Sequence, residues 1–197
     1  MNTNSHSDDL KAIRKIMEES SRFLSLSGLS GIFAGIFAIC GSVIAVIVIQ
    51  KSQAAEINRP ELILLLDALI VLFAALGIAV GLSLRKASLR DLKIWTTTTK
   101  RMLLNLLIPL ITGAVMILAF YLEGNYEYII PSMLVFYGLA LVSAGKFTFG
   151  EIQYLGIFEV LTGIFALFFP GLGLVLWAFG FGILHTLYGL IMHIKYR

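Results

Sequence analysis

The chain has 197 residues, of which 58% are hydrophobic and only 14% are charged, and its mean hydropathy is +0.91. Soluble domains average about half apolar and a quarter charged residues, so this composition excludes an ordinary soluble protein. The formal net charge is +3, but the Lys and Arg residues lie at the ends of apolar segments and form no basic face for nucleic acid. The single cysteine, Cys40, excludes an intramolecular disulfide and a Cys-based metal site.

Six apolar segments are long enough to cross the roughly 30 Å core of a bilayer, which takes about 20 helical residues. They cover residues 23–49, 62–84, 102–122, 128–145, 152–169 and 172–194. Each is continuously apolar, whereas a membrane-spanning barrel strand has about ten residues of alternating polarity. The sequence therefore predicts an all-α, polytopic membrane protein with one transmembrane domain, residues 23–194.

The basic residues predict how this domain is oriented. Of the 15 Lys and Arg residues, all but Lys51 and Arg59 fall in the N-terminal segment, the second and fourth loops or the C-terminus. Lys and Arg concentrate in cytoplasmic loops, so we expect both termini on the cytoplasmic side.

The N-terminal segment, residues 1–22, is polar and precedes the first span. Leu10, Ile13 and Met17 share one helical face with Lys and Arg beside it, which is typical of an amphipathic helix on the inner leaflet. A cytoplasmic extension of the first span fits the pattern equally well. The second loop, residues 85–101, allows the same two interpretations, an interfacial helix or a prolongation of the second span.

Recurring glycines predict an internal repeat. A glycine after a small residue or threonine marks the first, third and fifth spans, at Gly35, Gly113 and Gly163. The fourth and sixth spans each contain two glycines seven residues apart, at positions 138 and 145 and at positions 182 and 189. With Pro170 and Gly171 as the only break between the last two spans, the pattern predicts three tandem helical hairpins of like orientation.

Two further glycine pairs form small-residue ridges that let helices approach closely: Gly31 with Gly35, and Gly77 with Gly81. We expect these ridges to pack the first span against the second, or to lie at the seam of a homodimer.

Ionisable side chains inside the apolar segments are the candidates for function, because each costs at least a few kcal/mol in hydrocarbon and normally faces a partner or water. Glu159 and His185 are symmetric about position 172, so a fold at Pro170 brings them to one depth, about 12 Å from the cytoplasmic end. We expect a hydrogen-bonded pair. It either relays a proton, since histidine titrates near neutral pH, or acts as a fixed polar clasp between helices.

Asp67 is the third candidate and lies in the outer part of the second span. A symmetric first hairpin places it opposite Ser42 or Val43, where it snorkels, binds the serine or lines an outer vestibule. Thr112 and Tyr137 are symmetric about the third loop, which predicts a packing contact between them.

The motifs of several enzyme classes are missing from the sequence. It has no His-Glu-x-x-His zinc pattern, no second intramembrane aspartate for an aspartyl dyad and no nucleotide-binding loop. We therefore predict a non-enzymatic protein with no catalytic residues, no cofactor and no metal or nucleic-acid ligand.

Residues 18–31, Glu-Glu-Ser-Ser-Arg-Phe-Leu-Ser-Leu-Ser-Gly-Leu-Ser-Gly, resemble the signature of a six-helix inner-membrane protein family of Bacteroidota. The third to sixth spans are similar, more weakly, to small acid-resistance membrane proteins of enteric bacteria. The first resemblance implies a bacterial inner-membrane location and a partner-binding or regulatory role in envelope homeostasis, with the bilayer, other inner-membrane proteins or a second copy as partners. The alternative is a small proton-coupled transporter or channel that uses Glu159 and His185.

Overall fold

A computed structural model describes residues 27–54, 56–89 and 94–196, and these residues form helices and turns without any strand. The long helices are α2 (Gly28–Gln53), α3 (Pro60–Leu89), α4 (Thr97–Leu122), α5 (Ile129–Gly145) and α6 (Gly150–Phe168). The short 3-10 helix η1 (Tyr126–Tyr128) leads into α5. Pro170–Lys195, called the last crossing below, contains the 3-10 turn η2 (Pro170–Leu172), α7 (Gly173–Trp177), the π-helix η3 (Ala178–Leu184) and α8 (His185–Lys195).

Six of these helical segments are long and apolar enough to cross a membrane. This confirms the predicted all-α fold with six membrane-spanning helices. Their bounds differ from the prediction mainly around the second loop, because α3 continues to Leu89 and α4 already begins at Thr97. The Thr96 side chain caps α4 by accepting a hydrogen bond from the backbone N–H of Thr99 at 3.1 Å. The described part of this loop therefore prolongs the spans, while the predicted amphipathic N-terminal segment, residues 1–22, lies outside the described residues.

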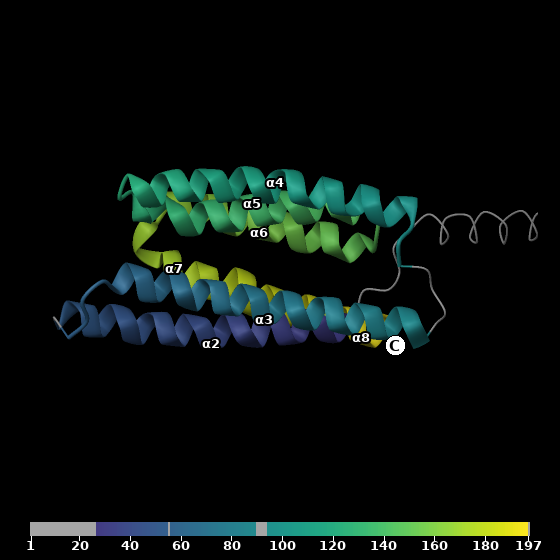
Figure 1. The fold of residues 1–197 in the computed structure, drawn as a ribbon, viewed down its shortest axis with the longest axis horizontal. Coiled ribbons are helices and arrows are strands. Elements are labelled where there is room, and N and C mark those ends of the chain that lie inside the picture. Colours follow the sequence, from purple (N-terminus) through teal and green to yellow (C-terminus); the bar gives the residue numbers. More distant parts are fainter. Residues whose placement is uncertain (1–26, 55, 90–93, 197) are drawn as a thin grey trace, which may run out of the picture.

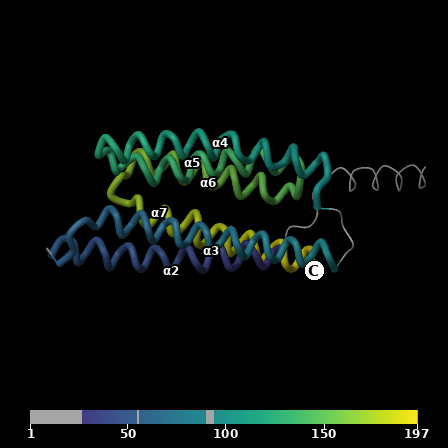
Figure 2. Tube along the Cα trace, in the orientation of Figure 1, coloured from purple at the N-terminus to yellow at the C-terminus, as the bar shows by residue number. Residues whose placement is uncertain are grey.

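The helices form two groups that lie one above the other in Figure 1. In the α5 group, α5 lies between α4 and α6; in the α2 group, α2 lies between α3 and the last crossing. The first and last described helices, purple and yellow in Figure 2, are therefore neighbours. The two groups meet where α5 and α6 pack against the last crossing, and we call this contact the seam.

The third predicted hairpin runs from one group to the other. Helix α6 packs mainly on α5, and α8 packs mainly on α2, so the turn at Pro170 crosses the seam. Glycines explain this pairing. A β-carbon on Gly138 of α5 would lie 2.6 Å from the carbonyl oxygen of Gly156 on α6. A β-carbon on Gly31 of α2 would lie 2.9 Å from the Cα of Gly189 on α8. Such backbone contact is possible only without side chains.

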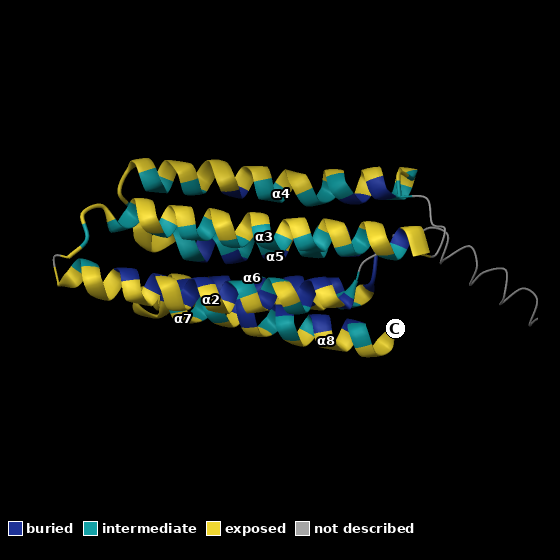
Figure 3. Ribbon diagram, turned by 60° about the horizontal axis from the view of Figure 1, so that its bottom comes forward, coloured by how far each residue is buried: buried dark blue, intermediate teal, exposed yellow. Residues whose placement is uncertain are grey.

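The predicted packing of the glycine ridges between the first two spans is wrong. Gly31 and Gly35 pack against the last crossing, where a β-carbon on Gly35 would lie 2.5 Å from the Gly182 carbonyl oxygen. Nothing lies within 4 Å of a β-carbon placed on Gly77 or Gly81. Those two glycines are exposed because α3 turns other residues toward α2, and Figure 3 shows the exposed face that results along α3.

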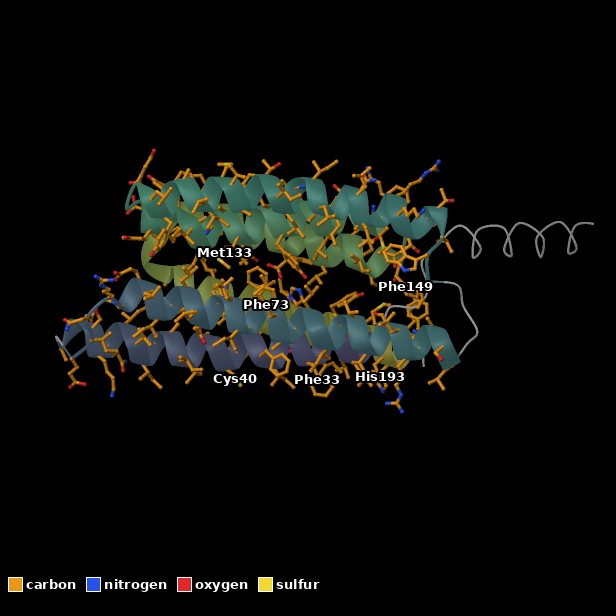
Figure 4. All side chains as sticks on the ribbon, viewed as in Figure 1. Phe33, Cys40, Phe73, Met133, Phe149 and His193 are labelled. Carbon is orange, nitrogen blue, oxygen red and sulfur yellow. The ribbon has the colours of Figure 1, made fainter. Side chains whose placement is uncertain are left out.

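Large apolar side chains cover the outside of the bundle. Helix α3 has only one buried residue, Ala87, and Phe33 and Cys40 point outward from α2 (Figure 4). An apolar surface of this kind is compatible with lipid as the surrounding solvent. The helical backbone is compatible with lipid as well, because each helix satisfies its own hydrogen bonds.

A buried glutamate at the seam

Glu159 is a fully buried acidic residue at the centre of the protein. It lies nine residues from each end of α6, Gly150 and Phe168, which is roughly 13 Å at 1.5 Å per residue. Its exposed fraction is 0%. The side chain is inside because it belongs to the buried stripe of α6, which includes Gly156 and Gly163 and packs on α5 and the last crossing.

Gly180 of the last crossing makes the space for this carboxyl group. A β-carbon at position 180 would lie 2.5 Å from Oε2 of Glu159 and 2.6 Å from Cδ2 of Leu134. The carboxyl therefore packs directly on the backbone of the π-helix η3.

His185, the first residue of α8, approaches the same carboxyl group. Its Nδ1 lies 3.2 Å from Oε1 of Glu159 and 3.1 Å from the carbonyl oxygen of Gly180. Its Nε2 lies 2.8 Å from the hydroxyl of Tyr137 on α5. This geometry fits the neutral tautomer in which Nδ1–H donates to Gly180 and the Tyr137 hydroxyl donates to Nε2.

Neither oxygen of Glu159 has a hydrogen-bond partner, although the distance to His185 is that of an ion pair. The two observations agree in the tautomer that carries its proton on Nδ1, because that N–H then donates to the Gly180 carbonyl rather than to Glu159. Glu159 is thus close to a proton donor without a hydrogen bond to it.

The π-helix η3 prepares this arrangement. It contains Gly180 and Gly182 and lies immediately before His185. π-helical turns are rare, occur often at functional sites and disturb the regular carbonyl pattern of the α-helix. Here one carbonyl of the segment, that of Gly180, accepts from the His185 ring. The ring of Phe181 packs beside those of Tyr137 and His185, with centroids 5.1 and 5.8 Å away.

The residues of the site come from both helix groups. Glu159 and Tyr137 belong to the α5 group, whereas His185 and Gly180 belong to the α2 group. The hydrogen bond between Tyr137 and His185 therefore crosses the seam.

Charge balance limits the states of this site. A buried carboxylate without donors is very costly, while a neutral carboxylic acid, or a carboxylate beside an imidazolium, is tolerated. Each favourable state holds one proton more than a bare carboxylate beside neutral His185. The arrangement is suited to binding an exchangeable proton.

Asp67 is not part of this site. Its carboxyl lies at the contact of α3 with α2, 3.3 Å from the position that a β-carbon on Gly41 would occupy, and the side chain is half-buried. The Ser42 hydroxyl donates to the Ile39 carbonyl at 2.7 Å, so it does not serve Asp67 as a donor.

Tyr137 and Gly180 were not predicted as site residues. The hydrogen bonds of Thr112 and Tyr137 go to other groups, since Thr112 donates to the Ile108 carbonyl at 2.9 Å and Tyr137 bonds to His185. A signal for Tyr137 exists in the neighbouring Gly138, because a close α5–α6 contact at that glycine brings position 137 to the depth of Glu159.

No group of three or more His, Cys, Asp or Glu residues suited to a metal ion occurs in the described part of the chain. Comparisons of the sequence with protein-family models and curated proteins, and of the fold with solved structures, find no match.

Proposed function

We propose that this integral membrane protein is a small proton-coupled transporter or channel in which Glu159 binds and releases the proton. The observation that supports the proposal most is that both oxygens of a fully buried carboxyl lack a hydrogen-bond partner. Buried polar groups in proteins are almost always hydrogen-bonded, and the exceptions often have a functional reason. The alternative is a structural clasp, in which the carboxyl oxygens would normally have hydrogen-bond partners.

The position at the seam gives proton binding a mechanical consequence. When His185 is neutral, the Tyr137 hydroxyl donates to Nε2 across the seam. When both ring nitrogens carry protons, Nε2 becomes a donor and the tyrosine must accept. Protonation of His185 therefore reverses the bond between the helix groups, and we expect this reversal to couple proton exchange between Glu159 and His185 to movement at the seam.

Vesicles that contain the purified protein and an internal pH-sensitive dye test this function. After a pH gradient is imposed, wild-type vesicles should lose it faster than protein-free vesicles. Glu159→Gln should return the rate to that of protein-free vesicles. Asp67→Asn is the matched control, because it removes an intramembrane carboxyl away from the seam, and it should retain the wild-type rate. A wild type no faster than empty vesicles, or an unaffected Glu159→Gln variant, would contradict the proposal.

A non-enzymatic, partner-binding role in envelope homeostasis is the second candidate. Gly77 and Gly81 favour it, because their ridge on α3 is open and such ridges pair membrane helices, including identical ones. We take a second copy of this chain as the occupant, because a glycine ridge on one membrane helix can pack against the same ridge on another. Replacing both glycines with Leu should abolish chemical cross-linking between copies in native membranes, whereas Val115→Leu on the exposed face of α4 should not. Equal cross-linking in both variants would count against it.

The location proposed for the protein is the bacterial inner membrane with both termini in the cytoplasm. The distribution of Lys and Arg supports this orientation. A tag placed after Arg197 should be labelled by a membrane-impermeant reagent only after the cells are opened, and labelling of intact cells would reverse the assignment.

A further inference from the structure

The two ends of the seam are held together by different kinds of contact. At the Pro170 end the chain itself joins the groups, because Phe169 is the single residue between α6 and η2. Gly173 of α7 lies there against α5, and a β-carbon on it would be 3.9 Å from the β-carbon of Ile130. The buried polar side chain of α5 near this end, that of Ser132, is uncharged. Among the described residues, this end of the seam is therefore joined by the chain and by apolar packing.

The opposite end of the seam is held by a polar cluster. The carboxylate of Glu151, in the first turn of α6, accepts hydrogen bonds from the Lys195 ammonium and from the Tyr196 hydroxyl, the latter at 3.1 Å. Glu151 belongs to the α5 group, whereas Lys195 and its neighbour Tyr196 lie at the end of the last crossing, in the α2 group. These bonds therefore cross the seam.

An aromatic side chain completes the contact at this end. Phe149, the residue before α6, is only 6% exposed and lies near the end of the bundle in Figure 4. Its ring centroid is 4.4 Å from that of Tyr196 and 6.0 Å from the ammonium of Lys86 on α3. A side chain of the α5 group thus contacts two elements of the α2 group. We call Phe149, Glu151, Lys195 and Tyr196 the latch.

Glu159 needs a movement of its surroundings to exchange a proton with water. Its own exposed fraction is 0% and that of His185 is 5%. The two side chains lie on opposite sides of the seam, 3.2 Å apart. Separation of the helix groups would therefore bring water to both of them.

The two ends differ in how readily they can separate. At the latch, water can replace the polar partners, because an ion pair with an exposed member contributes little to stability and the Lys195 side chain is 58% exposed. The buried ring of Phe149 favours the closed state, since separation exposes apolar surface. The chain that joins the groups at this end, from Leu89 to Thr97, is also longer than the link at Pro170.

We propose that the two helix groups separate at the latch, with the Pro170 end of the seam as the hinge, when Glu159 exchanges its proton with water. The inference rests on the proposed function and adds the movement that gives the buried carboxyl access to water. The latch keeps this end of the seam closed between exchanges. Glu151 and Lys195 supply its charged part, and Phe149 with Tyr196 its aromatic part.

Two reversible cross-links in a Cys40→Ser background test the movement, in vesicles with an imposed pH gradient. Ile130→Cys with Gly173→Cys closes the hinge end, because a distance of 3.9 Å between β-carbons suits a disulfide. Glu151→Cys with Lys195→Cys, joined by a short cleavable thiol cross-linker, closes the latch end. The first cross-link should leave the wild-type rate of gradient loss unchanged, whereas the second should reduce it to that of protein-free vesicles. Cleavage of the second by a reductant should restore gradient loss, which shows that the variant is folded.

A charge reversal tests the latch itself. Lys195→Glu places two carboxylates side by side and should raise the rate of gradient loss by about twofold to fivefold, the effect expected for a partly exposed ion pair. Glu151→Lys together with Lys195→Glu exchanges the charges and should return the rate to the wild-type value. Lys51→Glu is the matched control, because it breaks an ion pair with Glu56 away from the seam, and it should leave the rate unchanged.

The outcomes distinguish this inference from the proposed function. A wild type no faster than protein-free vesicles would overturn both. With an active wild type, gradient loss that continues through the latch cross-link, or that stops when positions 130 and 173 are joined, would overturn the movement alone. A rate in Lys195→Glu equal to that in Lys51→Glu would show that the ion pair does not hold the seam closed.

Discussion

Gly180 and Glu159 occupy one shared space at the seam, since a β-carbon on the glycine would lie 2.5 Å from Oε2 of the glutamate. The backbone of the α2 group is therefore shaped around a carboxyl group of the α5 group. That relationship connects the π-helix, the buried acid and the contact between the two helix groups.

Gly180→Ala should destabilise the protein by about 1–3 kcal/mol, the usual cost of overpacking a filled interior. Reversible unfolding in mixed micelles measures the change. Gly171→Ala is the control, because nothing lies within 4 Å of a β-carbon there. The cost should shrink in a Glu159→Ala background, since contacting residues do not behave additively. Equal costs in both backgrounds would show that the carboxyl does not determine the need for glycine.

Glu159→Met separates a proton-binding acid from a structural clasp. Methionine has a similar volume, and its introduction leaves the bonds of His185 to Gly180 and Tyr137 in place. The free energy of unfolding should therefore stay within about 1.5 kcal/mol of wild type or rise. A loss of about 3 kcal/mol or more, typical of breaking a buried ion pair, would favour the clasp.

Tyr137→Phe removes the donor to Nε2 of His185 and leaves a buried ring nitrogen without its partner. The expected loss of unfolding free energy is about 1–3 kcal/mol. Tyr154→Phe, on the exposed face of α6, should change it by less than about 0.5 kcal/mol. Two equal values would mean that the Tyr137–His185 bond contributes nothing to the seam.

The two glycine ridges should respond differently to the same substitution. Gly35→Ala forces a β-carbon toward the Gly182 carbonyl oxygen and should cost about 1–3 kcal/mol in unfolding free energy. Gly77→Ala enters open space and should change the stability of a single copy by less than about 0.5 kcal/mol. Similar losses at both positions would contradict the assignment of Gly35 to the contact between α2 and the last crossing.

The sequence predicted the six spans well, because the length and polarity of each apolar run are local properties. It also predicted that Glu159 and His185 lie close together, because a break at Pro170 places residues equally far from it at the same depth. The predicted hydrogen bond between them is wrong, since neither oxygen of Glu159 has a hydrogen-bond partner. The partners of the glycine ridges were not predictable in this way. Gly31 and Gly77 look alike in sequence, yet only Gly31 meets a neighbour, and the neighbour is the most distant helix in the chain. The place of Tyr137 in the site was not predictable for the same reason, because its contact with His185 joins helices that do not follow one another in the chain.

The π-helix could not be predicted from the sequence, because Gly180 and Gly182 are equally compatible with an ordinary membrane helix. Its consequence, a carbonyl that takes the Nδ1 proton and leaves the carboxyl without a donor, depends on the hydrogen-bond directions of a folded site. The family resemblance of residues 18–31 stays a prediction, since no match to a known protein bears on it.

The central claim is that Glu159 and His185 share one exchangeable proton at the seam. A nuclear magnetic resonance titration of the isotope-labelled Glu159 carboxyl and the two His185 ring nitrogens tests it most directly, with Glu159→Gln and Asp67→Asn to assign the signals. We predict that the carboxyl and ring signals change together in a single coupled step as the pH is varied. A carboxyl signal that stays that of a carboxylate at every pH, beside a histidine whose ring signals do not change, would contradict the account.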